Sequence, residues 1–520
     1  MFNSFIFLFV VMTGLCECAN ILYVMPFTSK SHHIMLKPIG LELARRGHNV
    51  TVITGFRDKN APANYRQIQV DQKEIWDVIG TKRPNVFDMV GVSTEEFHNM
   101  ILWRGGLGFT NLTLNSAEVK SFLAEDNKFD LVICEQFFQE AMNILAHKYK
   151  APLVLVTTFG NCMRHNIMIR NPLQLATVIS EFLEVRNPTS FFARLRNVYF
   201  TVYEYVWWRY WYLEEQEKLV RKYIPNLEEP VPTLLEMQKN ASLILINGHF
   251  SFDTPAAYLP NIIEIGGVHL SKSDTKLPAD LQNILDEAKH GVIYINFGSN
   301  VRSAELPLEK RNVFLNVIKK LKQTVVWKWE DDSLDKMDNL VVRKWLPQKE
   351  ILSHPNIKVF ISHGGLIGTQ EAIFHGVPII GVPIYADQYN NLLQAEECGF
   401  GKILEFKDIT EQNLDNYLRE LLTNNTYRDK AKEMSIRFKD RPTTALDTAM
   451  YWIEYILRHN GASFMKNPAR KLHWIQYAML DVYGFILAVV LTIFYTIYKL
   501  SSFILHKLKA PERVIRKKFD

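Results

Sequence analysis

Polar residues that could bind or activate a ligand gather in one stretch of the chain, from Trp345 to Asn391. In order they are Trp345, Gln348, His363-Gly364-Gly365, Glu371, Asp387 and Gln388. Two apolar runs within the stretch, 358–362 and 378–382, have the length and β-branched composition of strands, and each leads through a turn into a helical segment. Repeated strand–turn–helix units build a parallel sheet, whose ligands bind outside the carboxyl ends of the strands. The sequence therefore predicts that these polar residues line one rim of a sheet.

A second group of reactive side chains lies near the N-terminus. His32 and His33 fall in the loop between a predicted strand at 20–26 and a predicted helix at 34–46. Glu135 directly follows another apolar run of strand length. A carboxylate beside a histidine orients the imidazole and stabilises its protonated form, which is the arrangement that general base catalysis needs. An acid at this position also suits the first turn of a helix, and this alternative stays open.

The elements that would position both groups form two series. Further strands are predicted at 49–54, 129–134, 243–247, 262–265, 292–297 and 324–328, and a further helix at 309–320. A polar stretch, 271–276, separates the two series and is typical of a linker. The pattern predicts an α/β protein made of two doubly wound domains that face one another across a cleft.

The charge distribution argues against a nucleic-acid partner. The chain of 520 residues has a net charge of +5, and the last segment, 499–520, carries seven Lys or Arg against two acids. That tail accounts for the whole excess, so the domains before it are close to neutral. Nucleic-acid binding domains are usually basic.

Both ends of the chain have the composition of targeting segments. Residues 1–18 contain an apolar run followed by small residues and are predicted to be a signal peptide, although a signal anchor or a first buried strand would share this composition. Residues 482–505 are predicted to span a membrane as a helix, with a buried core helix as the alternative. The basic tail, 506–520, contains Lys517-Lys518 near its end and resembles a dilysine retrieval signal, or a basic flank without that role. We expect a single-pass type I protein of the endoplasmic reticulum membrane with lumenal domains.

That location would expose three sequons to glycosylation, at Asn111, Asn240 and Asn424. Once the signal is removed, three cysteines remain, too few for a disulfide framework and without zinc-ligand spacing; a Cys134–Cys162 bridge stays open. The segment 199–212 holds nine aromatic residues. It is predicted to be core, with an acceptor cleft or a membrane-facing surface as alternatives.

The motifs in the stretch 345–391 are specific enough to resemble a known family. The series Trp345-Leu346-Pro347-Gln348, His363-Gly364-Gly365, Glu371, His375-Gly376-Val377-Pro378 and Asp387-Gln388 is similar to the signature of the UDP-glycosyltransferases. Phe297-Gly298-Ser299 and both terminal segments also match the membrane-bound members, so the resemblance covers nearly the whole chain. It implies a GT-B fold, with the acceptor bound by the N-terminal domain and the donor by the C-terminal domain.

The resemblance also implies a role for each donor-side residue. Ser299 and His363 would contact the diphosphate, Trp345 would stack on uracil, Gln348 would contact the uridine, Glu371 would accept the ribose hydroxyls, and Asp387 and Gln388 would hold the sugar. These roles make physical sense, since stacking a base on an aromatic ring contributes about 1–3 kcal/mol. Gly364 and Gly365 at the start of a helix allow a phosphate to approach the backbone N–H groups.

For catalysis the resemblance implies that His32 is the general base and Glu135 its partner. The acceptor oxygen would attack the anomeric carbon opposite UDP, which inverts the configuration. The resemblance implies that UDP-sugar is a co-substrate and that helix N–H groups, rather than a metal, stabilise the UDP leaving group, so we expect neither a cofactor nor a metal. In keeping with this, the chain has no Asp-x-Asp motif.

Two positions depart from the family's pattern. Glu135 stands where Asp is usual, and its side chain is one methylene longer. Ile367 stands where many members have Asn for the α-phosphate, so the N–H groups of Gly368 or Thr369 would have to replace that contact. A lost hydrogen bond to a charged group costs roughly 1.5–3 kcal/mol.

We therefore predict an enzyme of the detoxification type that transfers a hexose, with glucose favoured, to hydroxyl groups of small lipophilic acceptors. A catalytically lapsed member that binds the nucleotide-sugar without turnover is the alternative, and a membrane-tethered scaffold is the third hypothesis; self-association is possible under each. The predicted segments are a signal peptide at 1–18, an acceptor domain at 19–270, a linker at 271–281, a donor domain at 282–460, a membrane-proximal segment at 461–481, a transmembrane helix at 482–505 and a tail at 506–520.

Overall fold

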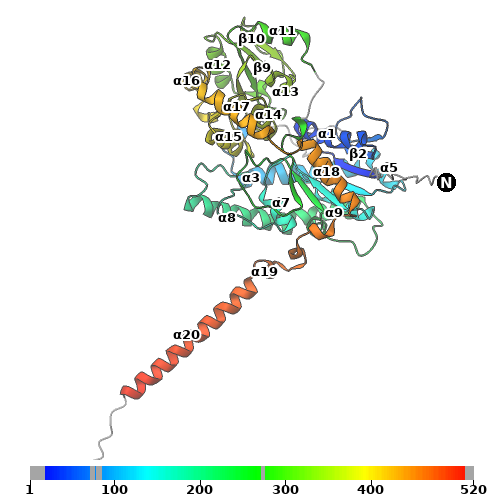
Figure 1. Ribbon diagram of the computed structural model, residues 1–520, viewed down its shortest axis with the longest axis vertical. Helices are drawn as coiled ribbons and strands as arrows, with labels where there is room; N and C mark the ends of the chain where they lie inside the picture. The colour runs from blue at the N-terminus through cyan, green and yellow to red at the C-terminus, as the bar shows by residue number, and fades with distance from the viewer. Residues whose placement is uncertain (1–17, 71–76, 78–84, 271–275, 510–520) are drawn as a thin grey trace, which may run out of the picture. The chain divides into compact units, whose positions relative to one another are not determined.

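The computed structural model describes residues 18–70, 77, 85–270 and 276–509 (Figure 1). Parts of three predicted segments lie outside these residues: 1–17 of the signal peptide (1–18), 271–275 of the linker (271–281) and 510–520 of the tail (506–520), which includes Lys517-Lys518. The chain divides into two compact units, 1–466 and 467–520, and each is described by itself.

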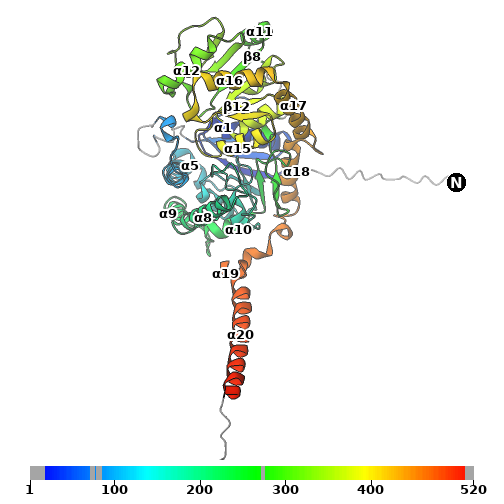
Figure 2. The same cartoon turned by 90° about the vertical axis from the view of Figure 1, so that its left-hand side faces the viewer.

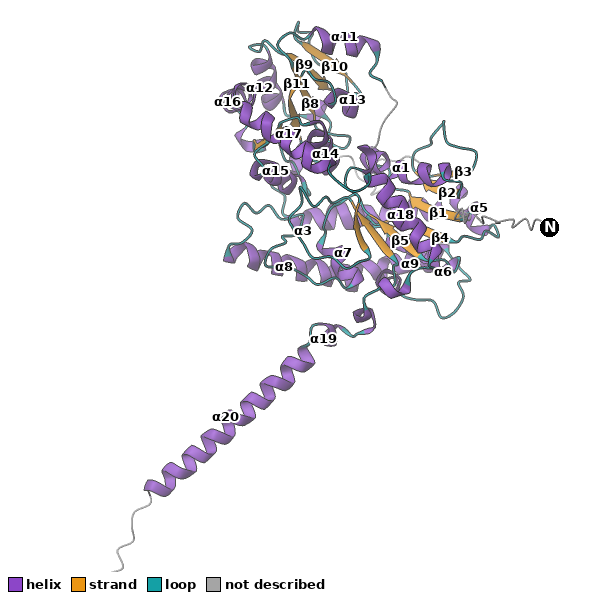
Figure 3. Cartoon of the chain, viewed as in Figure 1, coloured by secondary structure: helices purple, strands orange, loops and turns teal. Residues whose placement is uncertain are grey.

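The larger unit contains two parallel sheets within its described residues (Figure 3). The first has seven strands in the order β3-β2-β1-β4-β5-β6-β7, and the second has six in the order β10-β9-β8-β11-β12-β13. The first comprises β1 (Asn20–Met25), β2 (Asn49–Thr54), β3 (Tyr65–Gln69), β4 (Leu131–Glu135), β5 (Leu153–Val156), β6 (Leu243–Ile246) and β7 (Ile262–Glu264). The second comprises β8 (Val292–Asn296), β9 (Thr324–Lys328), β10 (Leu340–Arg343), β11 (Ile357–Ser362), β12 (Ile379–Gly381) and β13 (Gly401–Ile403).

Helices cover both faces of each sheet (Figure 2). Beside the first sheet they are α1 (Lys30–Arg45), α3 (Thr94–Phe97), α4 (Arg104–Asn115), α5 (Ala117–Ala124), α6 (Ile144–Lys148), α7 (Met163–Ile169), α8 (Phe191–Trp207), α9 (Leu213–Tyr223) and α10 (Leu234–Lys239). Beside the second they are α11 (Ala279–Glu287), α12 (Leu308–Ile318), α13 (Gln348–Leu352), α14 (Leu366–His375), α15 (Gln388–Glu397), α16 (Glu411–Thr423) and α17 (Asn425–Lys439). The predicted doubly wound α/β architecture is confirmed.

The strands that were predicted agree with the observed ranges to within one or two residues, because most are short apolar runs that are buried on both faces. The strands β3, β10 and β13 were not predicted. The start of α1 was predicted wrongly. The helix begins at Lys30 rather than Ile34, so His32 and His33 lie in its first turn and not in a loop. The His33 N–H donates to the Ser29 carbonyl (3.1 Å), which closes a helical turn through residues too polar to show an apolar period.

The aromatic segment 199–212 divides between core and surface. Phe200, Trp208 and Tyr212 are buried, which confirms the core prediction for them. Tyr199, Trp207 and Tyr210 are exposed, and together with five further apolar side chains on α8 they form a stripe: Phe191, Phe192, Leu195, Val198 and Val202. Periodicity alone did not separate the two faces, because both are apolar.

The last helix of the larger unit, α18 (Ala445–Arg458), returns to the first sheet. It packs beside α1, with Ala449, Met450 and Ile453 buried in the cluster that also holds residues of β1 and β4. The predicted donor domain, 282–460, includes α18, although this helix contributes to the core of the other sheet. The predicted linker, 271–281, also ends inside α11, which begins at Ala279.

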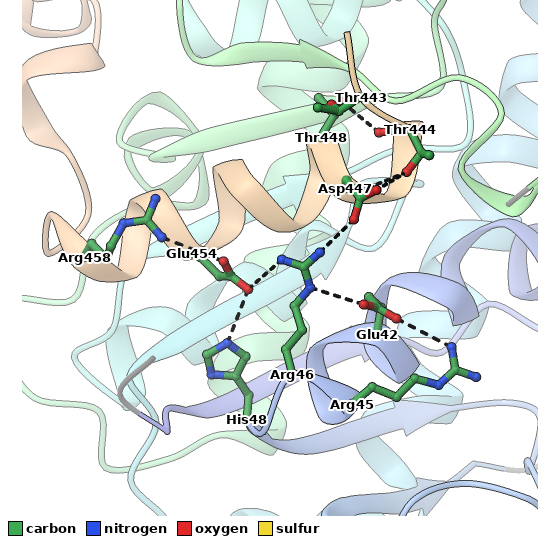
Figure 4. A network of polar contacts seen from close by, with 10 residues as sticks. All are labelled: Glu42, Arg45, Arg46, His48, Thr443, Thr444, Asp447, Thr448, Glu454 and Arg458. Atoms are coloured by element: carbon green, nitrogen blue, oxygen red, sulfur yellow. Dashed lines mark hydrogen bonds and ion pairs between the residues drawn. The ribbon is translucent and has the colours of Figure 1, made fainter. Parts of the chain in front are cut away.

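One arginine ties α18 to α1 (Figure 4). The Arg46 guanidinium donates to Glu42 (3.2 Å) on α1, and to Asp447 (2.8 Å) and Glu454 (3.2 Å) on α18. Three acids around one cation form a network that neutralises charge on both helices. Such networks contribute more to the stability of the fold than isolated surface ion pairs do.

The smaller unit contains α19 (Trp474–Tyr477) and the long helix α20 (Leu480–Lys509). Within the segment Leu480–Leu508, an 18-residue window has a mean hydropathy of 2.1 and is not buried by any other part of the described chain. By length and composition the segment is a candidate membrane span, and it contains the predicted span 482–505.

Replacing Arg46 with Ala should lower the stability of the larger unit by about 1–2 kcal/mol, because three carboxylates on two helices lose their shared cation. The neighbouring Arg45 is the matched control: it is exposed and, among the described residues, its ion-pair partner is Glu42, at 3.6 Å. Its replacement by Ala should change the stability by less than about 0.5 kcal/mol. Thermal unfolding of the solubilised full-length protein measures both, and equal melting midpoints for R46A and R45A would contradict this role.

Candidate active site

The His32 side chain is bonded to Glu135 at the carboxyl edge of the first sheet. β1 and β4 are parallel neighbours, with Val24 opposite Cys134, so the first turn of α1 lies next to the end of β4. His32 Nδ1 lies 2.5 Å from Glu135 Oε1. Glu135 is the last residue of β4, so its alternative interpretation as a helix residue is wrong. The longer side chain of Glu, compared with Asp, reaches the imidazole from this position.

The surroundings of His32 fix its ring. Thr158 Oγ1, just past the end of β5, lies 3.3 Å from Nδ1, and the rings of Phe27 and Phe137 meet the imidazole edge-on at 4.7 and 4.5 Å between centroids. Because a carboxylate can only accept, Nδ1 must carry the proton of the Glu135 bond. Nε2 therefore keeps its lone pair and is the nitrogen that could accept a proton from a hydroxyl.

His33 has a different environment, although it is the next residue. Its ring packs against Phe56 at 5.1 Å, and burial lowers its pKa to about 4, with the charge of Lys37 adding to the effect. It is neutral at physiological pH, and it makes no hydrogen bond to Glu135 among those of the described residues. The structure thus separates two histidines that the sequence places side by side.

On the second sheet, Gln348 and Glu371 are bonded to each other. The Gln348 amide donates to Glu371 (2.5 Å), and its oxygen accepts from Asn296 (2.6 Å) at the end of β8. Glu371 is buried in α14, and burial raises its pKa to about 7, although the bond from Gln348 acts in the opposite direction. Gly368 makes room for this pair, because a Cβ there would lie 3.1 Å from the Gln348 amide nitrogen.

His363 is held between two glycines. A Cβ on Gly298 would lie 2.6 Å from His363 Cε1, and a Cβ on Gly365 would lie 2.6 Å from its Nε2. Gly298 also has a φ of +94°, which favours glycine. Burial lowers the pKa of His363 to about 4, with Lys328 nearby, so the ring is neutral. Its Nδ1 and the Ser299 hydroxyl are buried and have no hydrogen-bond partner among the described residues.

The remaining predicted donor residues lie on the same rim. Trp345 is 48% exposed, and the Lys30 ammonium lies 3.9 Å from the centre of its ring. Asp387 precedes α15 and accepts from Asn391 (2.9 Å), while Gln388 is the first residue of α15 and its oxygen accepts from the Ile384 N–H (2.8 Å). Gly364 has a φ of +85°, which turns the chain into α14.

The two rims face each other within the larger unit. The Ser29 hydroxyl and the Asn300 side chain lie within 3.5 Å, and Lys30 reaches Trp345 from the first domain. Burial raises the pKa of Asp387, and the charge of His32 acts to lower it, so these two groups lie within electrostatic range. The histidine of one sheet and the acid of the other therefore lie close together where the two rims meet.

Ile367 has a structural role in place of the expected Asn. It packs against the cluster formed by α1, β1 and α18, so it joins α14 to the first sheet. The adjacent Gln370 adds to this contact, because its amide donates to the Asn247 carbonyl (2.8 Å) and its oxygen accepts from the Gly267 N–H (3.1 Å).

Sequence analysis missed several residues that complete the site. Thr158, Asn296 and Lys328 each lie at or just past the carboxyl end of a strand. Their positions could have been predicted from the sequence. Ligands bind outside the carboxyl ends of parallel strands, and this rule, which located Glu135, also applies to β5, β8 and β9. The side chain of Lys328 pairs with the half-buried Glu330 (2.5 Å).

Comparison with known proteins identifies the family. The family model described as "UDP-glucoronosyl and UDP-glucosyl transferase" matches residues 20–513. UDP-glucosyltransferase 2 of Dactylopius coccus is 35% identical over 484 residues, which cover 92% of each chain. The chain belongs to the UDP-glycosyltransferase family. UDP-glucuronosyltransferase 2B19 of Macaca fascicularis is 30% identical over 502 residues and 93% of each chain.

As a UDP-glycosyltransferase, the protein is an enzyme whose family uses UDP-sugar donors. The crystal structure of the kitacinnamycin glycosyltransferase has a TM-score of 0.56, is 17% identical, and aligns with 85% of this chain and all of its own. That similarity concerns the fold alone, and it confirms the predicted GT-B architecture. Among the described residues of this glycosyltransferase, no group of three His, Cys, Asp or Glu side chains is placed to hold a metal.

The predicted modification sites differ in exposure. Asn240 and Asn424 are exposed at helix ends. Asn111 is half-buried within α4 and accepts a hydrogen bond from Tyr223 (2.7 Å). Cys134 and Cys162 are both buried and free, so the bridge that the sequence left open is not formed in the structure.

The raised pKa of Glu371 gives a testable pH dependence. Because the folded-state pKa of about 7 exceeds the ordinary 4.5, folding favours the protonated acid, and stability is lost as the pH rises from about 4.5 through 7. The full loss is roughly 3 kcal/mol. Glu371→Gln, which has no charge to desolvate, should therefore melt higher than wild type by a margin that grows between pH 5 and pH 8. A margin that does not change with pH would contradict the shift.

Proposed function

We propose that this protein transfers glucose from UDP-glucose to a hydroxyl group of a small lipophilic acceptor, with inversion at the anomeric carbon. The observation that carries the proposal is the His32–Glu135 bond at 2.5 Å, in a cleft whose opposite wall contains Asp387. His32 Nε2 removes the acceptor proton, the acceptor oxygen bonds to the anomeric carbon, and the bond from that carbon to the UDP oxygen breaks. Glu135 holds the imidazole and stabilises its positive charge as the proton arrives.

The donor binds along the second rim. The Trp345 indole stacks on uracil. Because the Lys30 ammonium lies over this ring, uracil must either displace Lys30 or stack on the opposite face of the indole. Glu371 in its ionised form accepts the ribose hydroxyls and is held in place by Gln348. The diphosphate accepts hydrogen bonds from the buried Ser299 hydroxyl, from the buried His363 nitrogen and from the N–H groups at the start of α14. Asp387 and Gln388 hold the sugar.

Aromatic side chains favour a lipophilic acceptor. Phe27 and Phe137 flank His32, and their rings contact Phe109 (4.9 Å) and Phe159 (5.6 Å) in turn. The acceptor hydroxyl is thus presented to the base from an apolar wall, which also excludes water from the transferred sugar.

We further propose that the domains lie in the lumen of the endoplasmic reticulum, anchored by α20, and that Asn240 and Asn424 carry glycans. The exposed position of both asparagines supports glycosylation, and the apolar composition of α20 supports the anchor.

Replacing His32 with Ala should reduce kcat by about 10²–10⁴-fold, because the general base is lost. The dissociation constant for UDP should stay within about threefold of wild type, since the nucleotide is bound by the other sheet. His33→Ala is the matched control, and it should keep at least about a tenth of the activity. Single-turnover transfer and UDP titration of both variants measure these effects; transfer by H32A at the wild-type rate would overturn the role of His32.

A donor panel tests the sugar. Full-length protein incubated with a panel of phenols and UDP-glucose, UDP-glucuronate or UDP-galactose should yield the glucoside as the main product by mass spectrometry. We expect at least about tenfold discrimination against UDP-glucuronate, because a second charge near Asp387 would be repelled. Glucuronide as the main product would overturn the choice of sugar. UDP binding without turnover of any pair would favour the lapsed-member hypothesis that the substitutions Glu135 and Ile367 suggested.

A further inference from the structure

A cavity of about 620 Å³ lies behind the donor rim, where the chain passes twice between the two sheets. Its walls come from the first crossing after β7 (Gly266–Leu270), the ends of α13, α14 and α17, and the second crossing at 441–446. None of the residues assigned above to donor or acceptor lines it. Nothing in the proposed transfer reaction uses this cavity.

Basic side chains converge on the cavity. Lys349, His375, Lys439 and Arg441 line it, with Glu350 as the acid among its lining residues. The Lys439 ammonium lies 4.3 Å from the centre of the Phe374 ring, and no carboxylate pairs with it among the described residues. The Arg441 guanidinium donates to two backbone carbonyls, those of Gly266 (3.1 Å) and Glu264 (3.2 Å), rather than to a carboxylate.

Partial burial of these charges is unfavourable. Burial lowers the pKa of Lys349, Lys439 and Arg441, which means that each charged form is poorly solvated; nearby acids offset part of this for Lys349 and Arg441. Cations removed from water are stabilised by a bound anion of opposite charge. Three cations on three different segments match a group with more than one negative charge.

The N-terminus of α18 points into the same space. Ala445 and Leu446, in its first turn, line the cavity together with Thr443 and Thr444. The partial positive charge at the start of a fourteen-residue helix favours an anion there. Asp447, the acid of this turn, is paired with Arg46.

The remaining walls are apolar. Phe438, Leu270 and Leu446 line the cavity beside the cations. Its volume lies within the range of small-molecule sites and far exceeds that of an inorganic phosphate ion. An occupant that fills it must therefore have an apolar body as well as a charged group.

We propose that this cavity is a second ligand site, separate from the transfer site, which binds an organic monophosphate with a flat apolar body. The phosphate is held by Lys349, Lys439 and Arg441 at the start of α18, and the apolar body packs against Phe438, Leu270 and Leu446. The ligand touches both chain crossings between the sheets.

Calorimetric titration of the detergent-solubilised full-length protein tests this site. AMP serves as the probe, with the transfer site saturated by UDP so that AMP cannot be detected there. We expect one AMP to bind, adenosine to bind at least tenfold more weakly because it lacks the phosphate, and inorganic phosphate to bind more weakly than AMP because it lacks the ring. Failure of both AMP and inorganic phosphate to bind the UDP-saturated protein would overturn the proposal.

Variants locate the binding. Lys439→Gln should weaken the binding of AMP at least tenfold. Lys439→Arg keeps the charge, so its affinity for AMP should stay within about threefold of wild type. Lys430→Gln is the matched control, since Lys430 lies on the same helix outside the cavity and pairs with Glu433. UDP affinity shows that each variant is folded. AMP binding by K439Q as tight as by wild type, or equally weakened by K430Q, would overturn the assignment to this cavity.

Discussion

The active site depends on one constraint: the carboxyl edges of two separate parallel sheets must be held face to face. Neither edge is complete alone, because His32 and Glu135 belong to the first sheet and the residues proposed to bind the nucleotide belong to the second. The chain holds the two edges together because its segment after the second domain returns to the first sheet. After α17 it crosses back, and α18 packs on the first sheet, where Arg46 joins it to α1. Ile367 and Gln370 on α14 contact the first sheet directly. The second domain is thus connected to the first through α18, which follows it in the chain, and through α14 within it.

Burial sets the charge states within the cleft. His363 is kept neutral, and Glu371 is kept close to the point at which it loses its proton, both because water is excluded from them. An uncharged imidazole can donate to a diphosphate without an added counter-ion, and a carboxylate that ionises at about neutral pH becomes a strong acceptor when hydroxyl groups arrive. Keeping such groups buried costs stability, and under the proposed function the binding of the donor would offset that cost.

Most of the sheet architecture could be predicted from the sequence, because buried parallel strands are continuous apolar runs. The rim positions of His32, Glu135, Glu371 and Asp387 followed from the same rule. The start of α1 could not be predicted, since its first turn is polar and its periodicity is hidden. The return of α18 was also missed: its apolar face fits either sheet, and only tertiary contacts decide between them. The pairing of Gln348 with Glu371 joins residues on two helices whose packing no local pattern encodes.

Glu135 departs from the usual Asp of the motif, and the backbone position of the histidine accommodates its longer side chain. Asp is the more usual partner for the histidine, and the extra methylene of Glu would overshoot if the histidine stood in a loop close to the strand end. Here His32 lies in the first turn of a helix that starts at Lys30, so the imidazole is fixed by α1 and by the rings of Phe27 and Phe137. The carboxylate reaches it at 2.5 Å from the last residue of β4. The early helix start and the longer acid are therefore two parts of one arrangement, and a change to either would require a change to the other.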